Sequence, residues 1–365
     1  MGGDDRRRTG RTRAAALAMA TAAVALAALT GGPSRALAAP AQTEAYAAYA
    51  AEIAASWSQF AQPNLEHLRT WWAGRAPARY ATVFYPFSGP DLGNALAMFP
   101  DADTYVLFGL EPPGALPDLP AWDADTVAAG LTELKASLST LLQVNYFFTR
   151  TMGKRLGGGS FNSITGVLLF FLAMSDCEVT GARRIAIAAG GAIAAGTAAD
   201  DPASGRARIP GVELTFRRGR GKRQTIRYFA VNVADAELGK GSADFVPYLR
   251  SQGRLVTMIK SASYLLHQDG AGDPARFAQI RALILAQSDF VVQDDSGVPL
   301  RLFARDTWKL QFHGTYDAPT PEFGKYLQRD LKVEIQRNST GKLPFSYGYA
   351  YKHGESNLMT AARTP

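Results

Sequence analysis

Polar residues beside two apolar runs are the first candidates for chemistry. Ser88-Gly89-Pro90-Asp91 follows the apolar run from Ala81 to Tyr85, and Glu111 ends a second run, Tyr105 to Leu110. This order predicts a strand, a tight loop, a helix and a second parallel strand, the unit from which ligand sites of α/β proteins are built. Amides at the start of such a helix can hold an anion or a ligand oxygen. Glu111 stands where dinucleotide-binding folds place a ribose-binding acid.

The same residues also have a purely structural interpretation, which the sequence leaves open. Ser88 and Asp91 would cap the helix, and Glu111 would begin the turn made by Pro112-Pro113-Gly114. The loop lacks the G-x-G-x-x-G spacing of a dinucleotide site. We therefore predict no nucleotide cofactor, and no other cofactor is indicated.

A second group of candidates lies in the other half of the chain. Lys260 follows the apolar run Arg254 to Ile259, which places it at the carboxyl edge of a parallel sheet. Asp294-Asp295-Ser296-Gly297 is interpreted either as a hairpin turn or as part of a site. His267 is a single histidine that titrates near neutral pH when unperturbed. The Asp/Asn spacing does not match a Ca²⁺ or Mg²⁺ loop, so no metal site is predicted.

The leading functional hypothesis is a binder of a small polar or anionic ligand at the sheet edge. We also predict that Asp91, Lys260 and Asp294 come within one concave site. The expected ligand contacts are Ser88, Gly89, Glu111 and Lys260.

Two other kinds of function fit the same residues. One is an extracytoplasmic hydrolase or group transferase, in which Asp91 and Asp294 act as general acid and base and His267 assists. The other is an envelope interaction protein without a pocket. Carboxylates with raised pKa values in a shared cleft would favour the enzyme.

The pattern of apolar runs and amphipathic segments predicts how these residues are positioned. We expect an α/β protein with a Rossmann-like, mostly parallel sheet, flanking helices and an appended antiparallel portion. Residues 39–365 are predicted to form a single domain. Its parts are a helical lead-in over 43–74 broken at Pro63, a sheet core over 80–188, a flexible Ala/Gly-rich loop over 189–210 and a second half over 211–365.

Three further segments carry specific predictions. A long amphipathic helix over roughly 123–149 leads to Gly157-Gly158-Gly159-Ser160, which is either a tight reversal or a second wall of the pocket. Strands over 212–217 and 225–233 are joined by RGRGKR, either a solvated hairpin tip or a contact for an anionic partner. The aromatic segment LPFSYGYAY, residues 343–351, is expected to be an edge strand or a lid.

The N-terminus predicts export. A basic region at residues 6–13 precedes an Ala/Leu/Val run at 14–29, and Ala36-Leu37-Ala38 fits a signal peptidase, so residues 1–38 are interpreted as a signal peptide. A transmembrane anchor is the rival interpretation, but the run is short and alanine is weakly apolar. The mature protein is expected to be periplasmic or secreted, with no stable membrane span. The Sec and twin-arginine routes both remain open.

Composition narrows the classes of partner. Of 365 residues, 47% are hydrophobic and 19% charged, which is typical of a globular protein. The formal charge is +7, but residues 1–38 supply four of these charges through six arginines and two aspartates. The remaining +3 argues against a nucleic-acid partner, and a small-molecule ligand is preferred. The single cysteine, Cys177, excludes an internal disulfide, and the oligomeric state is left open.

The order of several short motifs also carries a resemblance. YPFSGPD, LFGLEPPG, KSASYLLH, QDDSGVPLRLF and LPFSYGY occur in this order along the chain. In this arrangement the chain resembles a family of uncharacterised exported bacterial proteins. The resemblance implies export, and it brings no established activity or catalytic residue.

Overall fold

The computed structural model describes residues 55–116, 132, 163–197, 208–270, 274–349 and 355–364. Three predicted features lie outside these residues: the signal peptide, nearly all of the helix over 123–149 and the loop Gly157–Ser160.

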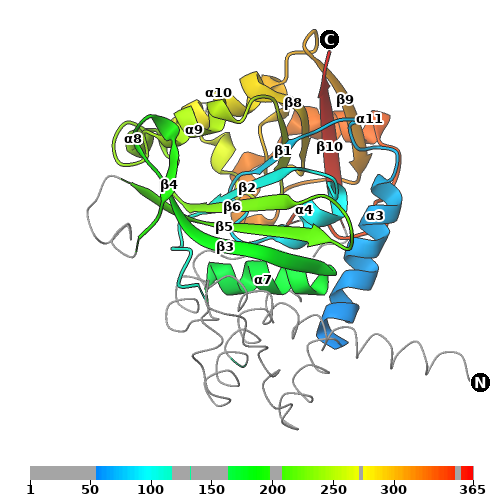
Figure 1. Cartoon of the computed structure of the whole chain (residues 1–365). Helices are drawn as coiled ribbons and strands as arrows, with labels where there is room; N and C mark the ends of the chain where they lie inside the picture. Colours follow the sequence, from blue (N-terminus) through cyan, green and yellow to red (C-terminus); the bar gives the residue numbers. More distant parts are fainter. Residues whose placement is uncertain are drawn as a thin grey trace, which may run out of the picture.

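In the described part of the chain, ten strands form one sheet through the middle of the molecule (Figure 1). Their order across the sheet is β4-β3-β5-β6-β2-β1-β7-β8-β10-β9. The strands are β1 (Thr82–Tyr85), β2 (Thr104–Gly109), β3 (Cys177–Ile187), β4 (Ile193–Ala195), β5 (Ile209–Arg218), β6 (Gln224–Ala230), β7 (Leu255–Ile259), β8 (Ser288–Gln293), β9 (Trp308–Gly314) and β10 (Asn357–Arg363).

The sheet is mixed, so the prediction of a mostly parallel, Rossmann-like sheet is not supported. The five central strands, β6-β2-β1-β7-β8, are parallel to one another. The β4, β3 and β5 strands on one side and the β10 and β9 strands on the other continue the sheet through antiparallel pairs. Two of the antiparallel pairs, β3–β4 and β5–β6, are hairpins closed by short turns, whereas β9 reaches β10 through a long connection that contains α11. The predicted hairpin at RGRGKR is one of these turns, joining β5 to β6.

Helices cover both faces of the sheet. The alternation along β1 shows the two layers: Val83 and Tyr85 pack on the side of α4 and α7, whereas Phe84 packs on the side of α9, α10 and α11. Figure 1 shows α7 across one face and α9 and α10 over the other. The α-helices are α3 (His67–Trp72), α4 (Leu92–Met98), α7 (Ile164–Met174), α8 (Asp235–Leu238), α9 (Phe245–Ser251), α10 (Ala278–Gln287) and α11 (Arg329–Asn338).

The helical lead-in passes through Pro63 without a break, contrary to the sequence prediction. Residues 55–61 are α-helical, η2 (Gln62–Glu66) is a π-helical turn and α3 continues the helix. Proline cannot donate the usual backbone hydrogen bond, and a wider turn accommodates that loss. Leu65, Leu68 and Trp72 therefore stay on the buried side.

Two segments differ in secondary structure from their predictions: one predicted to be a loop contains a strand, and one predicted to be a strand or a lid forms no strand. The Ala/Gly-rich stretch was expected to be a loose loop, yet η4 (Ala189–Gly191) and β4 lie within it, and β4 pairs with β3. The aromatic segment from Leu343 to Tyr349 forms no strand, and its rings Phe345, Tyr347 and Tyr349 are buried. Within the described ranges, none of the helices has the length and apolar character needed to cross a membrane.

Candidate functional site

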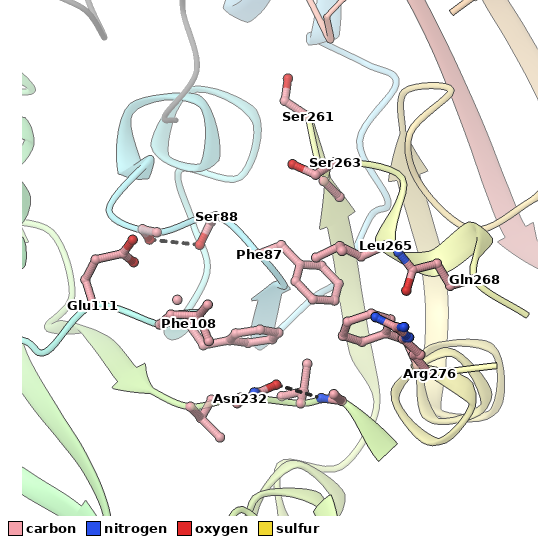
Figure 2. Close-up of a pocket in the computed structure, with 18 residues that line it drawn as sticks. Phe87, Ser88, Phe108, Glu111, Asn232, Ser261, Ser263, Leu265, Gln268 and Arg276 are labelled. Carbon is pink, nitrogen blue, oxygen red and sulfur yellow. Dashed lines mark hydrogen bonds between the residues drawn. The ribbon is translucent and has the colours of Figure 1, made fainter. Parts of the chain in front are cut away.

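A pocket of about 360 Å³ opens at the carboxyl ends of four neighbouring strands, β6, β2, β1 and β7 (Figure 2). Each strand contributes the residues that directly follow or end it. The lining consists of Phe87, Ser88, Gly89, Phe108, Gly109, Leu110, Glu111, Val231, Asn232, Val233, Ala234, Ser261, Ala262, Ser263, Leu265, Gln268, Arg276 and Phe277.

The position of the pocket follows from the topology. The chain leaves β1 through α4 to reach β2 on one side, while β7 pairs with the other side of β1. Loops leaving strands at such a reversal of strand order diverge and leave a crevice, which is where ligands bind in open α/β sheets. The five central parallel strands keep this feature although the sheet as a whole is mixed.

The two loops at this reversal have an unusual backbone. Four of the five non-glycine residues with positive φ in the described chain occur there: Phe87 at 58°, Ser261 at 54°, Ser263 at 51° and Tyr264 at 52°. L-residues disfavour this region because Cβ approaches the carbonyl oxygen, and bulky residues are rare in it. Strained backbone concentrated at one place is typical of functional sites, where surrounding contacts hold it.

Aromatic rings form the centre of the pocket wall. The Phe87 ring lies edge-on to Phe108, with centroids 5.1 Å apart, and to Phe277, with centroids 5.8 Å apart. Phe108 and Phe277 are buried and Phe87 is half-buried, so Phe87 is the most accessible of the three rings. Its left-handed backbone lies directly at the pocket wall.

Charged groups of opposite sign lie on opposite sides of these rings. Figure 2 shows Ser88 and Glu111 on one side and Gln268 and Arg276 on the other. Partial burial raises the pKa of the Glu111 carboxyl group, and the backbone N–H groups of Leu110 and Glu111 partly offset this effect. The carboxylate folds back over Gly109, where an added Cβ would lie 2.9 Å from Oε2. Within the described part of the chain, neither Glu111 nor Arg276 forms an ion pair.

Asp91 is buried beside the pocket and does not cap α4 through its side chain. It occupies the N-cap position, but its carboxylate accepts hydrogen bonds from Lys260 Nζ and Tyr85 Oη, both at 2.8 Å, and from Asn94 Nδ2 at 3.1 Å. The capping interpretation is therefore wrong for Asp91. The Asp91–Lys260 ion pair, whose side chains are 6% and 0% exposed, joins the loop after β1 to the end of β7.

The Asp294–Asp295 pair supports the second strained loop. Asp294 Oδ2 accepts a hydrogen bond from the Ser261 backbone at 2.9 Å, and Asp294 Oδ1 accepts one from Ser296 Oγ at 2.6 Å. Asp295 accepts hydrogen bonds from Tyr264 Oη and from Asn357 Nδ2. Burial, together with the neighbouring Asp295 charge, raises the pKa of the Asp294 carboxyl group above its usual range. The segment forms a buried turn with a positioning role. It is not the predicted hairpin, because β10 lies between β8 and β9 in the sheet.

His267 lies under the same loop, away from the pocket lining. Its Nε2 is 3.1 Å from the backbone oxygen of Asp295, and burial lowers its pKa to about 4. The neutral imidazole therefore donates this hydrogen bond near neutral pH. This placement assigns His267 a structural contact.

The predicted site residues thus fall into two groups. Ser88, Gly89 and Glu111 line the pocket. The other four are not among the lining residues and hold the loops that form it. They are Asp91, Lys260, Asp294 and His267.

Several residues of the site gave no signal in the sequence. Phe87 and Phe277 belong to apolar segments that could equally be core, and Arg276 is one of many arginines. Tyr349 lies far along the chain, yet its hydroxyl donates to Ser261 O at 2.6 Å and accepts from the Ser263 N–H at 3.1 Å. The one sequence feature near Tyr349 is the aromatic enrichment of residues 343–351, which predicts a strand or a lid and not a contact with the Ser261 loop.

Comparison with protein families, with curated proteins and with solved structures gives no match for this chain. The resemblance to exported bacterial proteins therefore stays a prediction. No cluster of three metal-ligating side chains occurs among the residues described.

Proposed function

We propose that this protein binds a small organic ligand in the pocket between the loops that follow β1 and β7. The observation that carries the proposal is the strained backbone of Phe87 and Ser261, which surrounds an aromatic-lined cavity at the topological switch point. The volume of about 360 Å³ lies at the lower end of the range for small-molecule sites, roughly 300–1,000 Å³.

Ser261 marks the same loop in a second way. The residue belongs to the pocket lining, but its Oγ is itself buried and has no hydrogen-bond partner among the described residues. Buried hydroxyls are usually satisfied, so this one is a further unusual feature of the strained loop.

A binding role is preferred to the acid–base enzyme. Asp91, Asp294 and His267 would have to reach a substrate, but none of them lines the pocket. Among the residues that the structure describes, Ser261 has no base hydrogen-bonded to its Oγ, as an activated nucleophile requires. The presence of the pocket also argues against an envelope protein that acts without one. We place the binder outside the cytoplasm on the signal-peptide pattern of residues 1–38.

The proposal is tested by ligand-observed NMR with a library of small fragments. Ala234 is half-buried in the pocket wall, so Ala234→Trp fills the cavity from its rim. Ala236, two residues further on, is exposed and outside the lining, so Ala236→Trp is the matched control. We expect fragments that bind the wild type and Ala236→Trp but not Ala234→Trp. A screen in which no fragment distinguishes the two variants would overturn the proposal.

A further inference from the structure

We infer that the ligand carries a cationic group and an anionic group at opposite ends of a flat apolar body. This inference rests on the proposed function, since it concerns the same pocket. It narrows the expected ligand from any small polar or anionic compound to one with two opposite charges.

The first argument is the separation of charge across the pocket. Glu111 and Arg276 lie on opposite sides of it, and neither is neutralised by an ion-pair partner in the described ranges (Figure 2). Two other charged pairs near the pocket are internal to the protein: Lys260 with Asp91, and Arg301 with Asp269. Glu111, which is half-buried, and Arg276, which is exposed, both line the pocket without such a pair, so a ligand can complement two charges of opposite sign.

The cationic end of the ligand belongs beside Glu111. This carboxylate is half-buried, and only backbone N–H groups offset its loss of solvent. A ligand ammonium group would supply the opposite charge that the protein does not. Ser88 on the same side adds a buried hydroxyl, whose proton is donated to Gly89 O at 2.9 Å, leaving its lone pairs as acceptors. Both groups thus select a hydrogen-bond donor.

The anionic end belongs beside Arg276. The guanidinium group offers donors in a planar fork that matches a carboxylate or a phosphate. Gln268 lies on the same side and its amide can donate a further hydrogen bond. The backbone N–H of Arg276 donates to Gln268 O at 3.2 Å, which ties these two residues together.

The middle of the ligand is defined by the rings. Phe87, Phe108 and Phe277 offer no hydrogen-bonding group between the two charged sides. A flat ring can stack or meet the half-exposed Phe87 ring edge-on, an arrangement that aromatic pairs favour. A charged or strongly hydrated centre would lose its water there without compensation.

The probe that tests this inference is 4-(aminomethyl)benzoate, a benzene ring with an ammonium at one end and a carboxylate at the other. Benzylamine, 4-methylbenzoate and benzyl alcohol carry the cation alone, the anion alone and no charge. Dissociation constants are measured by NMR titration of the full chain at low salt. We expect the doubly charged probe to bind about tenfold more tightly than either singly charged one, the ratio for one charge-assisted contact of about 1.4 kcal/mol.

Variants assign each end. Glu111→Gln is expected to weaken the doubly charged probe to the level of 4-methylbenzoate while leaving 4-methylbenzoate unchanged. Arg276→Gln should weaken it to the level of benzylamine and leave benzylamine unchanged. Arg220→Gln, at the exposed β5–β6 hairpin, is the control for a general change in charge.

Each outcome decides the inference. Equal binding of charged and uncharged probes, or loss of all probes in both variants, overturns the charge assignment. Absence of binding by any of the four probes overturns it as well. The proposed function would survive these results if the fragment screen still distinguishes Ala234→Trp from Ala236→Trp, so the two failures are separable.

Discussion

The buried Asp91–Lys260 ion pair gives the sharpest test of how the pocket loops are held. Lys260→Met removes the ammonium group and keeps an apolar stem of similar length. The Asp91 carboxylate then stays buried with hydrogen bonds from Tyr85 Oη and Asn94 Nδ2 but without its counter-charge. We expect the free energy of unfolding to fall because a buried charge without its partner is strongly unfavourable.

The magnitude follows from the burial of the pair. The two side chains are 6% and 0% exposed, which places them in the class where losing one partner costs about 3–5 kcal/mol. The two remaining hydrogen bonds to Asp91 put Lys260→Met near the lower end, about 3 kcal/mol. Adding Asp91→Asn should restore part of this loss, because an amide keeps hydrogen bonds to Tyr85 and carries no charge.

A second ion pair in the same protein provides the control. Lys222 Nζ lies 2.6 Å from Asp103 Oδ1, but these side chains are 50% and 58% exposed. Solvent screens such a pair, so Lys222→Met should cost less than about 1 kcal/mol. Urea unfolding at pH 7 followed by fluorescence of the five tryptophans measures both variants. If Lys260→Met were no more destabilising than Lys222→Met, the argument from burial would be refuted.

Two further predictions concern the buried support of the loops. His267 has a pKa of about 4 in the native state and an ordinary value of 6.5, so between these pH values the unfolded state binds the extra proton and stability falls as pH falls. Urea titrations measure the free energy of unfolding of the wild type and of His267→Gln at each pH. The wild type should lose about 3 kcal/mol relative to the variant between pH 6.5 and 4. If the free energies of the two proteins changed in parallel with pH, this prediction would be contradicted. Gly348 and Gly74 have nearly the same positive φ, +78° and +79°. A Cβ added at Gly348 would lie 2.6 Å from Asp294 Oδ2, whereas one added at Gly74 would have no atom within 4 Å. Gly74→Ala should cost about 1 kcal/mol and Gly348→Ala at least twice that, and equal melting temperatures for the two variants would count against crowding at Asp294.

Local patterns in the sequence were sufficient for the elements next to the pocket. The apolar runs predicted β1, β2, β6 and β7 within a few residues, because a buried strand needs an uninterrupted or alternating apolar pattern. The same reasoning placed Ser88, Gly89 and Glu111 at the carboxyl edge, where they line the pocket.

The arrangement of the strands, by contrast, depended on tertiary contacts. A strand pattern reports burial and does not specify the direction of its neighbour. The sequence therefore predicted an antiparallel portion but not which strands pair in it, such as β8 with β10 and β3 with β5. Pro63 likewise signalled a break, but packing of Leu65 and Trp72 kept the helix continuous through a π turn.

What the sequence alone determined is therefore the edge at which the pocket forms and three of its lining residues. Only the tertiary structure decided that Lys260 meets Asp91 across 169 residues and that Tyr349 holds the Ser261 loop. The left-handed backbone of Phe87 and Ser261 has no sequence signal, because neither residue type favours it. Contacts with residues distant in the sequence, such as those of Tyr349 and Asp294 with the Ser261 loop, hold the strained backbone in place. Residues that look like ordinary core or surface residues in the sequence therefore line the pocket.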